Sequence, residues 1–283
     1  MNTTLYYFTG TGNSLYVARE IQKRIPNTEL IPVVSLLANV KISTPNERIG
    51  FVFPLNGMTL PVPIKSFLKK LDVSKSNYFF AVVTRGGTKS FALKEINKYL
   101  RKKKVKLNAG FNLTMFNNDP KLTFFVIPTK DDFIKMEVKI AQKLSIIQQV
   151  IFNKEEFHES DTEGETFNFI PPVRFLLEKL ILLGTKYAAY EGAKDYFYSD
   201  EKCANCGTCE KVCPSGKIQM KEDEPVWQKR VKCYYCYACV NYCPKEAIQI
   251  KSKWFMKSYT KEKGRYPHPY AYAKDIADQK KIR

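Results

Sequence analysis

The sequence predicts an α/β protein with a doubly wound parallel sheet of five strands, followed by a small α+β domain that is rich in cysteine. Three observations lead to this prediction. A β-rich run at 3–8 passes through a glycine-containing loop into an amphipathic segment at 15–25. Apolar strands and amphipathic helices then alternate up to residue 152. All eight cysteines lie in two similar runs between residues 203 and 243.

The first strand, loop and helix follow from their residues. Apolar residues in the segment 15–25 keep helical spacing, and Pro26 ends it. The loop 9–14 reads Thr-Gly-Thr-Gly-Asn-Ser. It would place backbone N–H groups and hydroxyls at the positive end of the helix, which suits a phosphate. The loop lacks both the P-loop signature and the G-x-G-x-x-G signature of dinucleotide-binding folds.

The next elements alternate as a doubly wound fold requires. We expect further strands at 30–34, 48–53, 78–84 and 106–116, with helices at 63–71 and 90–100. The run at 78–84 is almost entirely apolar, as a parallel strand covered on both faces should be. Parallel sheets of this kind bind ligands at the carboxyl ends of their strands. Three loops should therefore converge at that edge, namely 9–14, 54–60 and 84–88.

The rest of the chain is divided by composition. A helical pattern at 129–152 ends the first domain, which is predicted to span 1–152. Residues 153–195 are predicted to form an acidic linker and a docking helix, because the apolar run at 173–189 needs a partner surface. The predicted cysteine domain spans 196–253. The basic tail at 254–283 could wrap over either domain or meet an acidic partner.

The two cysteine runs share one spacing. Each reads C-x2-C-x2-C-x3-C-P, and the second follows the first after thirty residues. This is the pattern of bacterial [4Fe–4S] ferredoxins, in which the fourth cysteine of a run ligates the other cluster. Zinc sites usually take separated pairs or include histidine, and disulfide frameworks need an oxidising compartment, so neither fits as well. The expected ligands are Cys203, Cys206, Cys209 and Cys243 for the first cluster, and Cys213, Cys233, Cys236 and Cys239 for the second.

The charge of the chain bears on its partners. The formal net charge is +18, from 46 basic and 28 acidic residues. Such a charge speeds association with acidic proteins, so we expect acidic redox partners. The lysines are spread along the chain without a nucleic-acid-binding motif, and nucleic acid is not an expected partner. With no basic leader and no run of ~20 apolar residues, a membrane span is not expected and the expected location is the cytoplasm.

A glycine- and threonine-containing loop of this kind, followed by a dicluster module, resembles the flavodoxin–ferredoxin fusion family of anaerobic bacteria and archaea. The resemblance covers nearly the whole chain, and the loop 9–14 matches the T-x-T-G-x-[ST] phosphate loop of flavodoxins. It implies a flavodoxin-like sheet domain that binds FMN. The implied phosphate-binding residues are Thr9, Gly10, Thr11, Gly12, Asn13 and Ser14. The residues implied to approach the flavin ring are Asn56, Gly57, Thr84, Arg85, Gly86 and Gly87.

Two features temper what the resemblance implies. Flavodoxins commonly stack a Trp or Tyr on the flavin, and neither occurs at 54–60 or 84–88. The glycines of these loops also have a simpler interpretation, since tight turns between strands and helices commonly use them.

Three functions are compatible with these residues. The first is an electron-transfer flavo-iron–sulfur protein, in which FMN couples two-electron donors to one-electron clusters and redox partners. The second is a ferredoxin-type carrier whose flavodoxin-like domain binds no FMN and only docks partners. The third is a basic iron–sulfur protein that associates with nucleic acid or a membrane. If the protein is an oxidoreductase, it works through its cofactors, because no conventional catalytic motif surrounds His158 or His268.

The second cysteine run differs from the first in its aromatic residues. Four tyrosines crowd it, at 234, 235, 237 and 242. We expect them to shield the second cluster from water and to give the two clusters different reduction potentials, because burial is one of the levers on such potentials.

Overall fold

The computed structural model describes residues 2–159, 171–191, 195–254 and 256–281. Its first part is a six-stranded, wholly parallel sheet in the order β2-β1-β3-β4-β5-β6. The strands are β1 (Thr3–Tyr7), β2 (Thr28–Pro32), β3 (Arg48–Pro54), β4 (Tyr78–Arg85), β5 (Ala109–Thr114) and β6 (Phe157–His158). The first five strands confirm the α/β prediction, and their order 2-1-3-4-5 is that of flavodoxins.

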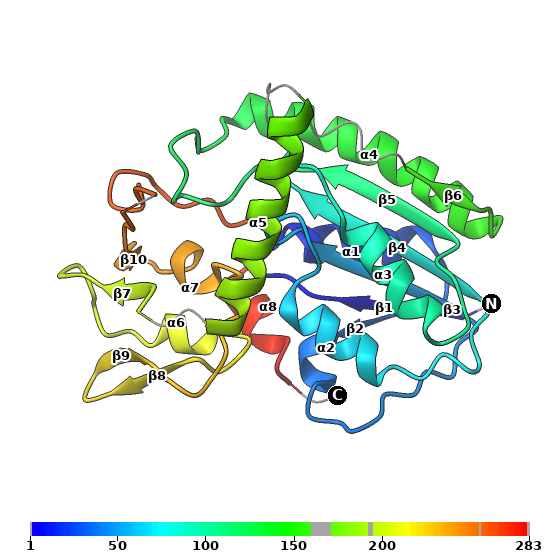
Figure 1. The fold of residues 1–283 in the computed structure, drawn as a ribbon, viewed down its shortest axis with the longest axis horizontal. Helices are drawn as coiled ribbons and strands as arrows, with labels where there is room; N and C mark the ends of the chain where they lie inside the picture. Colours follow the sequence, from blue (N-terminus) through cyan, green and yellow to red (C-terminus); the bar gives the residue numbers. More distant parts are fainter. Residues whose placement is uncertain (1, 160–170, 192–194, 255, 282–283) are drawn as a thin grey trace.

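The sheet is covered on both faces (Figure 1). Helices α1 (Asn13–Arg24) and α4 (Lys130–Phe152) bury apolar residues in one core, while α2 (Val62–Lys70) and α3 (Ala92–Arg101) bury theirs in the other. Every residue of β4 is buried, as the apolar run predicted. A short 3-10 helix, η1 (Val33–Leu36), follows β2. Thr129 and Asp132 form a capping box that starts α4.

The predicted linker also contributes a short strand and a helix to the fold. β6 pairs with β5 and adds a two-residue sixth strand to the five expected, so residues 157–158 are part of the sheet. Residues 160–170 lie outside the described residues. Helix α5 (Pro171–Glu191) then crosses in front of the loops that leave the sheet (Figure 1). It contacts the first domain through a 3.0 Å ion pair of Glu178 with Lys89 and a hydrogen bond from Thr185 to the Gly57 carbonyl.

The cysteine domain contains two small antiparallel pairs of strands. β7 (Phe197–Ser199) pairs with β10 (Ile248–Ile250), and β8 (Ile218–Lys221) pairs with β9 (Glu224–Trp227). The short helices α6 (Thr208–Lys211) and α7 (Ala238–Asn241) carry the third cysteine of each run. The domain lies at the carboxyl edge of the parallel sheet (Figure 1).

The C-terminal residues return to the first domain. We call residues 265–279 the C-terminal strap; it includes helix α8 (Ala273–Asp278). The strap is anchored by an ion pair of Asp275 with Arg19 of α1 and by a hydrogen bond from the His268 amide to the Thr11 carbonyl. Of the two possibilities expected for the tail, this part of it wraps over the sheet domain. No helix in the described part of the chain is long and apolar enough to cross a membrane.

Candidate functional site

The two cysteine runs fold into similar turns. In each run the residue before the short helix has a left-handed backbone, Gly207 with φ 69° and Tyr237 with φ 57°. A second left-handed residue lies two positions earlier, Asn205 in the first run and Tyr235 in the second. Such turns curl the chain tightly, so that cysteines separated by two residues face one centre.

The structure brings the eight cysteines together in two sets of four. The first set, Cys203, Cys206, Cys209 and Cys243, lines one pocket. The second set, Cys213, Cys233, Cys236 and Cys239, lines another. Each set takes three cysteines from one run and one from the other, which is the crossed grouping expected from the spacing. Within the residues that the structure describes, no group of His, Cys, Asp or Glu is gathered closely enough for a single metal ion.

The chemistry of these cavities fits [4Fe–4S] clusters. Four thiols surround each, and apolar residues such as Ile218 and Ile248 complete the walls. Burial raises the pKa of Cys209 to about 11 and that of Cys233 to about 12. These thiols therefore stay protonated without iron, and binding a cluster would release their protons.

The two sets differ in their exposure to solvent. Cys206 of the first set is exposed, and its hydrogen bond with Thr208 lowers its pKa. Burial instead raises the pKa of Cys236 and Cys239 in the second set well above the usual range of a thiol. The second set lies toward the sheet domain, and the first lies toward solvent.

The three loops implied for FMN also meet. The hydroxyls of Ser14 and Thr84 lie 2.8 Å apart and join loop 9–14 to loop 84–88. The amide of Leu55 donates to the Thr84 carbonyl over 2.8 Å and brings in loop 54–60. The loops therefore converge at the carboxyl ends of β1, β3 and β4, beside the point between β1 and β3 where the strand order reverses. In flavodoxin-like sheets that point is the ligand site.

This point is filled by the second cysteine run. A Cβ at Gly10 would lie 2.0 Å from the Cys236 carbonyl oxygen, so glycine is needed there for the other domain to approach. Asn56 donates from Nδ2 to the Tyr234 carbonyl over 3.1 Å. The Tyr234 ring meets Phe8 edge-on, with 6.1 Å between centroids. Residues 234–236 thus enter the crevice between the ends of β1 and β3.

The C-terminal strap covers the other side of loop 9–14. Gln279 is fully buried and pairs with both backbone groups of Thr9, accepting from its N–H over 3.1 Å and donating to its carbonyl over 3.0 Å. The His268 amide donates to the Thr11 carbonyl over 2.8 Å. Gly12 has φ +102°, and a Cβ there would lie 2.5 Å from that of Ala271.

The polar side chains of loop 9–14 all have protein partners. Thr9 Oγ1 accepts from the Gly12 amide and Asn13 Nδ2 donates to the Phe116 carbonyl. Thr11 Oγ1 accepts from Asn118, and Ser14 bonds to Thr84. In this structure the chain itself engages the polar side chains of the loop, so an FMN phosphate that used them would have to displace these contacts.

The ring-side loops are also partly covered by the chain itself. A Cβ at Gly57 would lie 2.2 Å from Thr185 Oγ1 of α5, and one at Gly86 would lie 3.3 Å from the Asn117 side chain. Arg85 is buried and donates to the Thr88 carbonyl. Gly87 has φ +101°, and a Cβ there would meet nothing within 4 Å. Of the three glycines in these loops, only Gly87 would leave an added Cβ without a close neighbour.

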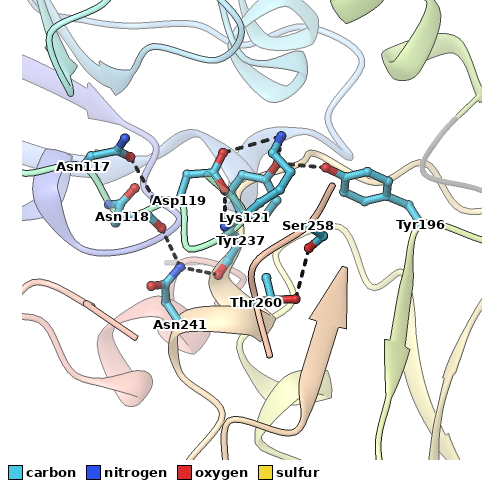
Figure 2. Close-up of polar contacts among 9 residues, drawn as sticks. All are labelled: Asn117, Asn118, Asp119, Lys121, Tyr196, Tyr237, Asn241, Ser258 and Thr260. Carbon is cyan, nitrogen blue, oxygen red and sulfur yellow. Dashed lines mark hydrogen bonds and ion pairs between the residues drawn. The ribbon is translucent and has the colours of Figure 1, made fainter. Parts of the chain in front are cut away.

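Sequence reasoning missed a partly buried polar network that joins the two domains (Figure 2). The loop after β5 supplies Asp119 and Lys121, and the second cysteine run supplies Tyr237. Asn241 of α7 donates from Nδ2 to the carbonyls of Asn118 and Tyr237, over 3.0 and 3.1 Å. The only sequence signal was a polar run, Asn117 to Pro120, after an apolar strand, and such runs usually read as surface loops.

One family model and several solved structures are similar to parts of this chain. Residues 202–248 match the family model described as a 4Fe-4S dicluster domain. No curated protein matches the chain. A flavodoxin from the domain Archaea is similar in structure at 16% identity and a TM-score of 0.34, covering 51% of this chain and 99% of its own. General stress protein 14 from Treponema denticola, solved in complex with FMN, has 10% identity and a TM-score of 0.34, covering 53% and 99%.

A third similar structure is rubredoxin oxygen:oxidoreductase from Desulfovibrio gigas, with 11% identity, a TM-score of 0.32, and coverage of 53% of this chain and 37% of its own. TM-scores this low do not by themselves establish a shared fold, so the flavodoxin-like assignment rests on the strand order of the sheet. The chain thus joins a sheet with the strand order of flavodoxins to residues that match a 4Fe-4S dicluster domain.

Proposed function

We propose that this protein is a two-cluster iron–sulfur electron carrier whose flavodoxin-like domain docks its own ferredoxin domain and binds no FMN. The observation that carries the proposal is the position of residues 234–236. They lie where a flavodoxin-like sheet would hold its ligand, and they bring the second set of cysteines to the same edge.

In this proposal each set of four cysteines holds one [4Fe–4S] cluster. A bound cluster carries one electron at a time. The chain's own residues position the two sites and exclude water. Both cavities are lined by Ile218 or Ile248, which belong to one shared apolar core, so the two sites are close neighbours within the domain.

The first set is the proposed exchange point with a partner. Cys206 is exposed, and the exposed Lys245 lines the same cavity. With a net charge of +18, the protein would attract an acidic redox protein and steer its approach. The second set is enclosed by the sheet domain, and the cluster that it holds would carry an electron away from the surface. The cytoplasm, where cysteine thiols stay reduced and available to ligate clusters, is the proposed location.

The competing function is the FMN-dependent one. It is favoured by the loop 9–14 itself, which starts helix α1 and carries the threonines of a flavodoxin phosphate loop. It would require the C-terminal strap and residues 234–236 to leave the edge of the sheet, because their contacts occupy the groups that a phosphate would use.

Anaerobic purification with iron, sulfide and FMN measured on the same sample tests the proposal. We expect iron and sulfide at about eight each per chain, twice the four of one cluster, with no FMN. Replacing Cys206 or Cys239 by serine should lower the iron content, whereas Ser252→Ala, a change at an exposed residue outside both cavities, should not. Stoichiometric FMN would contradict the flavin-free part and leave the clusters standing. Absence of iron would contradict the whole proposal.

A further inference from the structure

The residue Tyr237 is held in a backbone conformation that suits it poorly. Its φ is +57°, in the left-handed region, where a bulky side chain is a genuine outlier. The equivalent position of the first run, thirty residues earlier, is Gly207 with φ +69°. Glycine adopts this conformation without strain. The first run shows that glycine can occupy this position of the turn, so the tyrosine adds backbone strain that the turn does not need. Strain of this kind points to a role for the side chain.

The Tyr237 side chain connects the second cavity to the sheet domain, and Figure 2 shows its polar neighbours. Its ring lines the cavity of the second set. Its hydroxyl lies 3.3 Å from Lys121 Nζ and 3.2 Å from the Tyr196 hydroxyl. The Lys121 ammonium lies 5.8 Å from the centre of the same ring. A cation from the loop after β5 is therefore held against the wall of the second cavity.

Lys121 is partly buried and held by several contacts. Its side chain is 13% exposed and pairs with Asp119, which is 18% exposed, at 3.6 Å. Asp119 Oδ1 accepts from the Lys121 amide, and the Asp119 amide donates to Asn117 Oδ1. Burial, the largest single influence, would lower the pKa of Lys121, but Asp119 and Tyr196 together outweigh it and the pKa is raised, so the ammonium stays charged.

The first cavity has no matching arrangement among the described residues that line it. Gly207 offers no side chain at the position of Tyr237, and the lysine in its wall, Lys245, is exposed to water. The lysine that lines the second cavity, Lys217, belongs to the ferredoxin domain. Lys121 instead comes from the sheet domain and lies behind Tyr237, whose hydroxyl it contacts.

We propose that Lys121, held through Tyr237, is a positioning residue by which the flavodoxin-like domain raises the reduction potential of the second cluster. The inference rests on the proposed ligation of a cluster by the second set. Reduction adds a negative charge to a cluster. A nearby cation whose charge water does not screen therefore favours the reduced form. The sheet domain would thereby make the inner cluster a better electron acceptor than its burial alone allows.

A redox titration followed by electron paramagnetic resonance at pH 7 tests this inference on the full chain. In Lys121→Met we expect one of two midpoints to fall, while the other stays. A unit charge acting across a partly solvated interior changes such an equilibrium by about tenfold, which for a one-electron couple is 59 mV. Lys121→Arg keeps the charge and should hold the midpoint near that of the unaltered protein.

A second variant, with the opposite expected shift of the midpoint, distinguishes an effect of charge from a general disturbance of the structure. Asp119→Asn removes the compensating carboxylate and should raise the same midpoint that Lys121→Met lowers. Lys257→Met breaks an exposed pair with Glu262 at 3.1 Å and should move neither midpoint. Iron and sulfide are counted in every variant, so that loss of a cluster, which would count against the proposed function, is distinguished from a change of potential.

The inference is overturned if Lys121→Met leaves both midpoints unchanged with full iron and sulfide. It is also overturned if both midpoints move together, because the contact reaches one cavity only. Should Lys121→Met fail to load iron, Asp119→Asn decides alone, and an unchanged or lowered midpoint in that variant rejects the inference.

Discussion

At the scale of single residues, Arg265 holds the ferredoxin domain to the start of the C-terminal strap. It is 9% exposed, and its guanidinium donates to backbone carbonyls from several segments. These include Val240 at 3.1 Å, Thr260 at 2.9 Å and Ile248 at 3.2 Å. One side chain therefore satisfies carbonyls that the fold has buried away from water.

We expect Arg265→Ala to lower the free energy of unfolding by about 3 kcal/mol or more, because several buried acceptors lose a charged donor together. Chemical denaturation with the cluster absorbance as a second probe would measure this loss. Arg230→Ala, at an exposed arginine of the same domain, serves as the control and should stay within about 0.5 kcal/mol of the parent. Equal effects in the two variants would contradict the role given to Arg265.

His268 makes stability depend on pH. It is 2% exposed, its ring stacks on Tyr16 at 4.4 Å, and its Nε2 has no hydrogen-bond partner. Burial lowers its pKa to about 4, from the usual 6.5 of a histidine. The unfolded chain therefore binds a proton more readily than the folded chain between those values, so stability is complete above pH 6.5 and is lost as the pH falls toward 4.

At pH 5 this loss should be about 2 kcal/mol, from 1.36 kcal/mol per unit of pKa difference. Denaturation at pH 5 and pH 7 of the parent and of His268→Phe would measure it. The variant should show a smaller difference between the two pH values. An equal difference in both proteins would show that His268 does not titrate as its burial requires.

At the scale of elements, the C-terminal strap closes loop 9–14 through one buried amide. Gln279→Leu would leave the N–H and the carbonyl of Thr9 unpaired in a buried position. The expected cost is about 2 kcal/mol, expressed as local opening of the strap. Hydrogen exchange at α8 and at Thr9 would measure it, with Lys280→Ala at the exposed neighbour as the control.

The same variant examines the competing FMN-dependent function. If the strap is what keeps FMN out, Gln279→Leu should bind added FMN more tightly than the parent. Unchanged FMN binding, together with faster exchange in the strap, would place the obstruction at residues 234–236 instead.

Helix α5 depends on close approach at Gly57. This residue has φ +53°, and a Cβ added to it would lie 2.2 Å from Thr185 Oγ1. Gly57→Ala should therefore loosen α5 from the sheet domain and increase its cleavage by a protease. Gly184→Ala is a matched control in α5 itself, since a Cβ there meets nothing within 4 Å. It should stabilise the helix by up to about 1 kcal/mol. Faster cleavage of Gly184→Ala than of Gly57→Ala would contradict this account.

At the scale of the whole molecule, the charge is the property that a partner meets first. With 46 basic and 28 acidic residues, association with an acidic redox protein should be steered by attraction and screened by salt. We expect electron transfer to an acidic ferredoxin to slow by about tenfold or more between low salt and 1 M salt. Stopped-flow mixing would measure the rates. A basic cytochrome should show the opposite trend, and salt-independent rates with both partners would argue against electrostatic steering.

The two clusters are also expected to differ in potential, as the unequal tyrosines predict from the sequence. The first set lies toward solvent, and the second set is enclosed by tyrosines and the sheet domain. This remains a prediction. A single midpoint for both clusters would contradict it.

The sequence by itself determined the two parts of this protein. Alternating apolar strands and helices can bury their surface only as a covered parallel sheet, and cysteines at fixed short spacing can face only a shared centre. These signals are local, which is why the five strands and the two cysteine runs could be predicted. The edge strand β6 was missed because two residues carry no periodicity.

Only the tertiary structure decided how the two parts meet. Gly10 and Gly12 lie in a loop that matches a phosphate site, yet their missing side chains make room for Cys236 and Ala271, distant residues in the chain. No sequence pattern pointed to Gln279 or Lys121, because their partners, Thr9 and Tyr237, lie 270 and 116 residues away in the chain. A local motif indicates which ligand a loop could bind. The contacts of the folded chain decide whether the binding groups of that loop are available.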